Sequence, residues 1–385
     1  MATEEILLRF LVIITVIFFL PKVINRFYTI PSPLTEIFLG ILLGIFLPQY
    51  FYLDDMLQIL AAIGIVTLFV YAGLEVDSEL MIRKKSFFLE NLLIHLIVFL
   101  IVGWSMKAIF SLSAQVAFLV ALALTTPSAS YIFSSLERFS GEKRKLIEGK
   151  VITGEVAGIF LMVMILRLNN ILALITTLAL ILLLIFLLPI LLKFLYRTLF
   201  SKLVGSEFSF IFVVAVISAF ITDFMGIHFL VGAFIAGLIS RRFIQDIVAD
   251  KQYAHITHDR GRQIKEGFGF FALTFIPFYF FSVGLRIDKS MLAMATVALA
   301  VALCASISWL RILLISLHRF LRIREGFRHS TQIASAMIPT LVFTFVIAEL
   351  LLENFGISHD MFSALMLYGV LTAIASIAIV KTIRV

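Results

Sequence analysis

The sequence predicts an all-α polytopic membrane protein that forms one transporter domain over residues 1–385. Two compositional observations lead to this prediction: 62% of the 385 residues are hydrophobic, and only 14% are charged. A soluble domain usually carries about 25% charged residues, so this chain cannot cover a globule with water-compatible side chains. A third observation, a series of long apolar segments, gives the number of membrane crossings.

A helix needs about 20 apolar residues to cross a bilayer. Thirteen segments meet this requirement, the second and ninth only marginally, and turn residues such as Pro31, Pro33 and Gly226 mark their ends. The segments run approximately over 5–26, 33–47, 56–76, 87–110, 114–136, 147–168, 170–197, 207–225, 227–243, 267–285, 290–317, 329–352 and 358–382. The N-terminus carries Glu4 and Glu5 and no clear small-residue cleavage site, so we interpret it as the start of a retained span.

The positions of the basic residues predict the orientation of the chain. With the N-terminus outside and the C-terminus in the cytoplasm, most of the 31 Lys and Arg residues fall in cytoplasmic loops, including those in 138–150 and 319–328. Cytoplasmic loops of membrane proteins show this bias. It explains the net charge of +7 without a nucleic-acid partner. The single cysteine, Cys304, excludes a disulfide framework within the chain, and no phosphate-binding motif favours ATP hydrolysis.

A short repeat indicates two inverted halves. Residues 73–77 (GLEVD) end the third segment, and residues 284–288 (GLRID) end the tenth. Each copy follows a Gly-rich stretch, at 39–44 in the first half and at 231–237 in the second. The two copies are seven spans apart. Because seven is an odd number, the copies have opposite orientations in the membrane. Inverted repeats of this kind are typical of secondary transporters.

The repeat also predicts two broken helices. Pro127 lies in the middle of the fifth segment, and the offset of the repeat leads from it to within one residue of Pro339 in the twelfth. Only eight prolines occur in the chain, so the match is informative. Proline removes a backbone donor, and carbonyls freed inside a membrane must be satisfied by protein, water or an ion. Two ordinary kinks are the alternative interpretation.

Charged side chains inside a membrane are costly and usually functional. Glu155 in the sixth segment and Arg311 in the eleventh form the strongest pair of candidates, and Glu90 and His95 in the fourth are secondary ones. For His95 we favour a structural hydrogen bond between helices. Glu90 lies near enough to a helix end for its side chain to reach the interface.

A buried carboxylate can exchange a proton for a cation. Cation binding favours the ionised form of the carboxylate, whereas burial favours the protonated form. Competition between the two ligands for Glu155 is sufficient for obligate exchange if the site faces one side at a time. Arg311 keeps its proton at accessible pH, so it would be a fixed charge that balances the carboxylate or the carbonyl ends of the broken helices. A structural salt bridge between Glu155 and Arg311 is the alternative.

The sequence around these residues resembles that of the cation–proton antiporter superfamily. It is most similar to the branch that includes glutathione-regulated potassium-efflux transporters and related sodium–proton antiporters. The resemblance covers essentially the whole chain and rests on the order and spacing of several motifs. The motifs lie in 69–77, 123–129, 136–138, 154–159, 226–237, 280–288 and 309–313.

The resemblance implies a homodimer of thirteen-helix chains, two crossed broken helices and elevator-type alternating access. It further implies that different helices form the transport core, the dimerisation scaffold and the linker between them. The transport core would comprise about 87–168 and 290–382, the dimerisation scaffold about 5–76 and 207–285, and a linker helix about 170–197.

The resemblance also implies roles for single residues. Glu155 occupies the position of the ion-binding carboxylate, which would hold a monovalent cation together with Thr126. Arg311 matches a basic position that is often Lys in electrogenic relatives and Arg in electroneutral ones. The residues that match the two breaks, and that are expected to help coordinate the ion, are Thr125, Thr126, Pro127, Ser128, Ser335, Pro339 and Thr340.

This chain departs from the pattern of the superfamily in three places. Relatives usually carry Asp where this chain has Glu155, and the longer arm of Glu would shift the cation. They carry Asp, Asn or Gln where this chain has Gly154, so Arg311 is left to touch Glu155 itself. Potassium-efflux relatives have a nucleotide-binding domain after the last helix, and gating by such a domain is not expected within this chain.

We therefore expect a monovalent cation–proton antiporter in a bacterial or archaeal cell membrane. It would exchange one Na⁺ or K⁺ for one H⁺ without moving net charge, and it would need no cofactor and have no enzymatic activity. Two alternatives stay open. One is a sodium-coupled symporter of organic solutes on the same architecture, and the other is a sensor or channel derived from it, which the Gly154 departure makes plausible.

Overall fold

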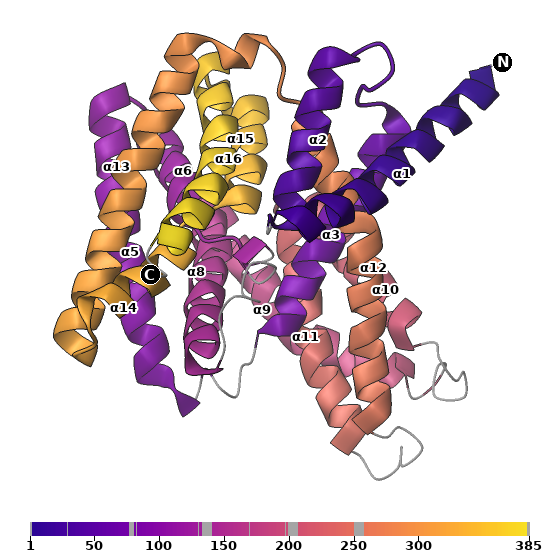
Figure 1. The fold of residues 1–385 in the computed structure, drawn as a ribbon. Coiled ribbons are helices and arrows are strands. Elements are labelled where there is room, and N and C mark those ends of the chain that lie inside the picture. Colours follow the sequence, from indigo (N-terminus) through magenta and orange to yellow (C-terminus); the bar gives the residue numbers. More distant parts are fainter. Residues whose placement is uncertain are drawn as a thin grey trace. The chain divides into compact units, whose positions relative to one another are not determined.

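The computed structural model describes residues 2–28, 30–76, 81, 83–129, 131–132, 141–168, 170–196, 198, 207–249 and 258–382. The secondary structure of these ranges is helical, as predicted (Figure 1). The helices are α1 (Ala2–Phe27), α2 (Ser32–Phe46), α3 (Asp55–Glu75), α5 (Lys85–Phe110), α6 (Ala114–Thr125), α8 (Gly141–Arg167), α9 (Ile171–Leu195), α10 (Glu207–Phe224), α11 (Phe229–Ala249), α12 (His258–Leu285), α13 (Met294–His318), α14 (Phe327–Ala336), α15 (Leu341–Phe355) and α16 (His359–Thr382). Two predicted features, Asp77 and the motif at 136–138, lie outside the described residues.

The predicted spans coincide with helices. Among the described residues, eight helices are long and apolar enough to cross a membrane by themselves, and α14 with α15 forms a bent pair that makes up to nine. Three further predicted segments are the shorter apolar helices α2, α6 and α10. Every segment predicted from the sequence overlaps a helix or a helix pair. The all-α fold with many membrane crossings is therefore confirmed.

The chain forms two compact units. The first contains Met1–Leu53, Met81–Leu166 and Phe280–Val385, and the second contains Asp54–Leu80 and Arg167–Tyr279. All of the candidate site residues belong to the first unit. The division into transport, scaffold and linker helices remains a prediction.

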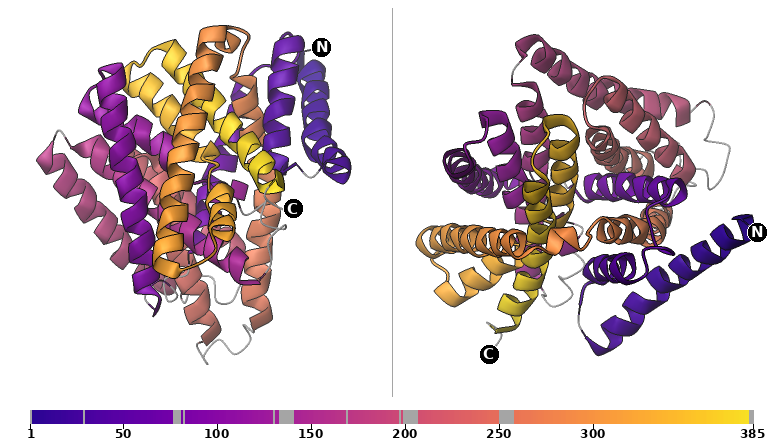
Figure 2. Two further views of the ribbon diagram at one scale, coloured as in Figure 1. Left: turned by 60° about the vertical axis from the view of Figure 1, so that its left-hand side comes forward. Right: turned by 90° about the horizontal axis from the view of Figure 1, so that it is seen from above.

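Both predicted helix breaks are present in the first unit. There α6 packs against α5 and α15, and α16 packs against α13 and α15 (Figure 2). Helix α6 ends at Thr125 because a proline two residues later has no amide donor and pushes the residue before it out of the helical region. Thr126 accordingly has φ −76° and ψ 119°. Pro339 lies in the short link between α14 and α15, which meet at a bend of 46°.

The Gly-rich stretches of the repeat form very close helix contacts. In the second unit, a Cβ on Gly73 of α3 would lie 3.0 Å from the carbonyl carbon of Gly237 in α11. In the first unit, a Cβ on Gly40 of α2 would lie 2.9 Å from the Cα of Gly284 at the end of α12. Each copy of the repeat motif thus packs against the Gly-rich helix of the other half. Small residues permit such close backbone approach in membrane helices.

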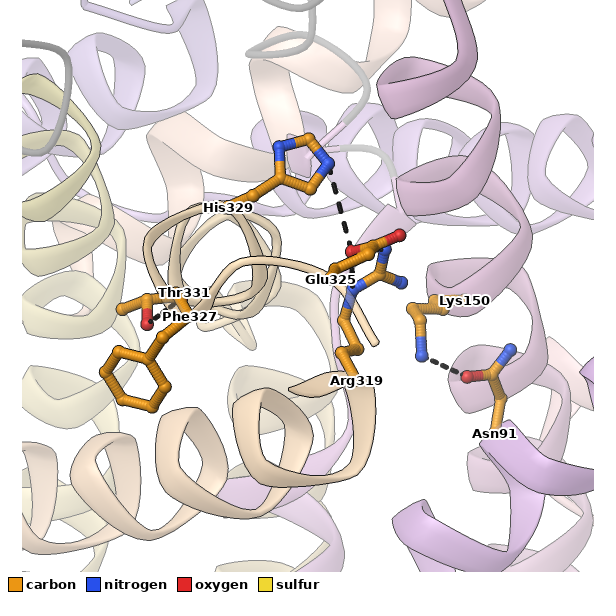
Figure 3. Close-up of polar contacts among 7 residues, drawn as sticks. All are labelled: Asn91, Lys150, Arg319, Glu325, Phe327, His329 and Thr331. Atoms are coloured by element: carbon orange, nitrogen blue, oxygen red, sulfur yellow. Dashed lines mark hydrogen bonds and ion pairs between the residues drawn. The ribbon is translucent and has the colours of Figure 1, made fainter. Parts of the chain in front are cut away.

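Two basic residues that were counted with the cytoplasmic loops are buried. Lys150 lies within α8, is 3% exposed and donates a hydrogen bond to Oδ1 of Asn91 (Figure 3). Arg319 is fully buried at the end of α13 and pairs with Glu325. Assigning these two residues to loops was wrong, because the distance of a residue from a span end does not reveal whether its side chain turns inward.

Candidate functional site

The two helix breaks meet inside the first unit. The backbone amide of Ser128 donates a hydrogen bond to the carbonyl oxygen of Pro339, with 2.9 Å between the two atoms. The hydroxyl of Thr344, in the first turn of α15, donates to the carbonyl oxygen of Ala123 at 2.7 Å. These bonds join the end of α6 to the start of α15, so the residues of both breaks lie side by side.

Glu155 lies on α8 beside the first break. Its side chain is buried, with 2% exposure. Its Oε1 accepts a hydrogen bond from the backbone amide of Ala129 at 3.4 Å. This amide lies just beyond Pro127 and Ser128, so α8 presents its carboxylate directly to the broken segment.

The first break also places Thr126 against α8. A Cβ on Gly158 would lie 2.9 Å from Oγ1 of Thr126, so the threonine side chain rests on this glycine, about one turn from Glu155. The Thr126 hydroxyl is buried and has no hydrogen-bond partner in the part of the chain that the structure describes. The Thr125 hydroxyl, in contrast, donates to the carbonyl of Ala121 at 2.7 Å. Thr126 therefore has an oxygen available for a ligand.

The hydroxyl groups of the second break are paired within the protein. Oγ1 of Thr340 lies 2.7 Å from Oγ1 of Thr344, and the Ser335 hydroxyl donates to the carbonyl of Thr331 at 2.7 Å. Pro339 offers a carbonyl oxygen that already accepts the Ser128 amide. The structure brings all these predicted residues together, but it leaves the second break fewer free oxygens than the first.

Arg311 binds the second break. Its Nη2 donates to the carbonyl of Met337 at 2.6 Å and its Nη1 to the carbonyl of Ile338 at 2.7 Å. The end of α14 leaves carbonyls without helical partners, and a cation is favourable there. Among the contacts of the described residues there is no ion pair between Arg311 and Glu155. Of the two roles considered for Arg311, the geometry supports balancing the carbonyl ends.

Tyr368 donates a hydrogen bond to a backbone carbonyl of the first break, as Arg311 does at the second. Its phenol is fully buried and donates to the carbonyl oxygen of Leu124 at 2.7 Å. Arg311 and Tyr368 thus each satisfy carbonyls that a break has freed. Sequence reasoning missed Tyr368, because a tyrosine in an apolar helix is usually an ordinary core residue and carries no signal of a distant partner.

The packing of Pro127 accounts for the unusual Gly154. A Cβ at this position would lie 2.7 Å and 2.8 Å from the Cγ and Cδ atoms of the Pro127 ring, and 3.7 Å from Nδ1 of His95. Any larger side chain would therefore displace the first break. The departure from the superfamily pattern goes together with a close contact between α8 and the broken segment.

A cavity of about 30 Å³ lies beside Gly154 and Pro127, between α5, α8 and α13. Its polar lining consists of Asn91, His95, Lys150 and Arg311. Sequence reasoning named His95 and Arg311 but missed the other two. A signal was present: Asn91 precedes His95 by four residues and Lys150 precedes Gly154 by four, so each pair shares one helix face.

The structure places the two secondary candidates in different surroundings. His95 lines the cavity, and its Nε2 is buried without a hydrogen-bond partner among the described residues. Glu90 belongs to a group of ion pairs, with Oε2 3.6 Å from Nε2 of His318 and Oε1 3.5 Å from Nε of Arg322.

A helical chain with many membrane crossings, and with two broken helices that meet beside a buried carboxylate, has the architecture of a secondary ion transporter. Residues 11–383 match the family model described as "Sodium/hydrogen exchanger, transmembrane". The chain belongs to this family of membrane antiporters, which are transporters and not enzymes.

Two known proteins illustrate the similarity. The chain is 25% identical over 387 residues to "Probable Na(+)/H(+) antiporter 3" of Methanocaldococcus jannaschii, covering 98% of this chain and 96% of that protein. Among solved structures it is similar to the sodium proton antiporter MjNhaP1 of the same organism at pH 8, with a TM-score of 0.70 and 16% identity, over 98% of this chain and 97% of the other. At that identity the structural likeness shows a shared fold.

Proposed function

We propose that this protein is a monovalent cation–proton antiporter in which Glu155 alternately binds a proton and Na⁺ or K⁺. The observation that carries the proposal is the place of this buried carboxylate, beside the junction of two broken helices and near the unpaired hydroxyl of Thr126. Membership of the sodium/hydrogen exchanger family supports the exchange. One relative is named a probable sodium–proton antiporter and the other a sodium–proton antiporter, which favours Na⁺ as one of the cations.

The transported cation would be held by oxygen atoms. The Glu155 carboxylate supplies the charge, Thr126 supplies a hydroxyl oxygen, and backbone carbonyls near Pro127 and Pro339 complete the site. Protonation of the carboxylate removes the charge that holds the cation, and a bound cation opposes protonation. Each ligand thus displaces the other, which couples their movements in opposite directions.

One cation exchanged for one proton leaves the charge of the site unchanged. Glu155 supplies a single negative charge, and Arg311 keeps its positive charge at accessible pH while it donates to the carbonyls of Met337 and Ile338. We therefore propose electroneutral exchange with a stoichiometry of one to one.

We further propose elevator-type alternating access in a homodimer. The N-terminus would lie outside and the C-terminus in the cytoplasm. The resemblance of the sequence to the cation–proton antiporter superfamily implies the access mechanism and the dimer. The distribution of Lys and Arg among the loops supports the orientation.

Proton flux in proteoliposomes tests this function. Purified protein is reconstituted with a pH-sensitive dye inside, and Na⁺, K⁺ and Li⁺ are added in parallel at several pH values. We expect Na⁺ or K⁺ to release protons from the lumen, and Glu155→Gln to abolish the signal. Glu148→Gln is the matched control, because it makes the same change at a partly exposed position of the same helix. Full activity of Glu155→Gln would refute the site assignment.

The same vesicles distinguish the alternatives. A sodium-coupled symporter would take up an organic solute with Na⁺ and release no protons. A channel would show flux far above the turnover of a carrier, and a sensor would bind cations without any flux. Dependence of the exchange rate on an imposed membrane potential at a constant pH gradient would refute electroneutrality.

A further inference from the structure

The cavity beside the first break, here named the polar cavity, is lined by Asn91, His95, Lys150 and Arg311 together with apolar residues. Its volume is about 30 Å³. Roughly 10–15 Å³ on this scale holds one water molecule, so the polar cavity has room for a monatomic ion. We propose that the polar cavity binds a small monovalent anion of the size of chloride.

The lining of the polar cavity is basic. Lys150 and Arg311 are both basic side chains, 3% and 4% exposed, and no acidic side chain lines the polar cavity. Their neighbours are neutral groups. Lys150 donates to the Asn91 amide oxygen and lies over the Phe87 ring. Arg311 donates to two backbone carbonyls and also hydrogen-bonds to Tyr368. Buried charges that lack a counter-charge are costly. A bound anion would supply that counter-charge.

The acidic groups nearest to Lys150 are engaged by other cations. Glu325 pairs with Arg319, as Figure 3 shows beside the contact between Lys150 and Asn91. Glu90 lies within ion-pair distance of His318 and Arg322. These carboxylates are therefore already shared, and neither forms an ion pair with Lys150 among the described contacts.

The polar cavity also contains buried nitrogen atoms without hydrogen-bond partners among the described residues. Nδ2 of Asn91 and Nε2 of His95 are buried, and neither has a partner in the described structure. The His95 nitrogen donates in the tautomer that carries the ring proton on Nε2. Because Oδ1 of Asn91 accepts from Lys150, its Nδ2 is left as a donor that needs an acceptor. Lys150 itself has three donors and no acceptor. An anion accepts from all of these groups, whereas a water molecule would satisfy hydrogen bonds and leave the charge unbalanced.

Thermal unfolding of the purified, detergent-solubilised protein tests the proposal independently of cation exchange. Melting temperatures are measured in sodium chloride, sodium bromide and sodium gluconate at equal Na⁺ concentration and pH. An anion at about ten times its Kd lowers the unfolding equilibrium constant about elevenfold. We expect melting temperatures in chloride and bromide that exceed the value in gluconate by on the order of 3 °C. Equal values in all three salts would overturn the proposal.

Variants assign the effect to the polar cavity. Asn91→Asp places a carboxylate of the same shape beside Lys150, so we expect a high melting temperature in gluconate and no further gain from chloride. Lys150→Met should also remove the gain, at the cost of lower stability. Lys145→Met makes the same change at an exposed position of the same helix and should keep the gain. If Asn91→Asp responded to chloride as the unchanged protein does, the anion would bind elsewhere and the proposal would be wrong.

Discussion

The backbone amide of Ser128 donates a hydrogen bond to the carbonyl oxygen of Pro339, with 2.9 Å between the two atoms, and this bond links the two helix breaks. The two residues lie far apart in the chain and in opposite halves of the repeat. Around this bond, the Thr344 hydroxyl and the Arg311 guanidinium satisfy further backbone carbonyls of the breaks. The broken segments thus form one connected region against which α8 places Glu155.

Arg311→Met should destabilise the protein and weaken cation binding together. The change leaves the carbonyls of Met337 and Ile338 without their donor, at a cost of about 1–3 kcal/mol for each unsatisfied group. We expect a lower melting temperature and a higher KM for the cation. Arg311→Lys should lose less, because an ammonium still donates to these oxygens.

Arg144→Met is the control for this prediction, since Arg144 is exposed and, among the described residues, pairs with Glu148 of the same helix. If Arg311→Met kept the original melting temperature and lowered the KM for the cation, Arg311 would act by competing for Glu155 rather than by holding the break.

Thr126→Val should raise the KM for the cation several-fold with little effect on stability. Valine has the shape of threonine without the hydroxyl oxygen, and that oxygen has no partner in the described structure. Thr126→Ser should keep most of the affinity. Thr125→Val is the matched control, because the Thr125 hydroxyl bonds to its own helix. Equal KM values for Thr126→Val and Thr125→Val would argue against a role of Thr126 in coordination.

Gly154→Ala should lower both the melting temperature and the transport rate. The added Cβ would lie 2.7 Å from the Pro127 ring, so the first break would have to move. Overpacking of this kind costs about 1–3 kcal/mol. In Gly269→Ala the new Cβ meets nothing within 4 Å, and this control should be neutral or stabilising, since Ala favours a helix over Gly by up to about 1 kcal/mol. Unchanged transport by Gly154→Ala would show that the break tolerates displacement.

The KM for the cation should fall as pH rises. Protons and cations compete for Glu155. At pH values below the pKa of its carboxyl group, each decrease of one pH unit should therefore raise the apparent KM about tenfold. The maximal rate at saturating cation should change less. Initial rates in proteoliposomes over a grid of pH and cation concentration measure both quantities. A KM that is independent of pH would indicate separate binding sites for the proton and the cation.

Much of the fold could be predicted from the sequence because the bilayer imposes local requirements. A span must be a continuous apolar helix, so each crossing appears in the sequence without knowledge of its neighbours. Pro127 and Pro339 mark the breaks for the same reason, since proline alters the backbone at its own position. Glu155 and Arg311 were visible because charges are rare in such segments.

The class of the protein, its helices, its two breaks and the charged residues near them could thus be predicted from the amino-acid sequence. The partners of these residues are visible in the three-dimensional structure alone. It assigned Arg311 to the carbonyls of the second break, gave Tyr368 the same task at the first, and brought Lys150 to Asn91 inside the fold. Such pairings depend on which helix faces meet across long stretches of chain. A helix in lipid forms from its own composition, but its neighbours are set by packing between surfaces that the local sequence does not specify.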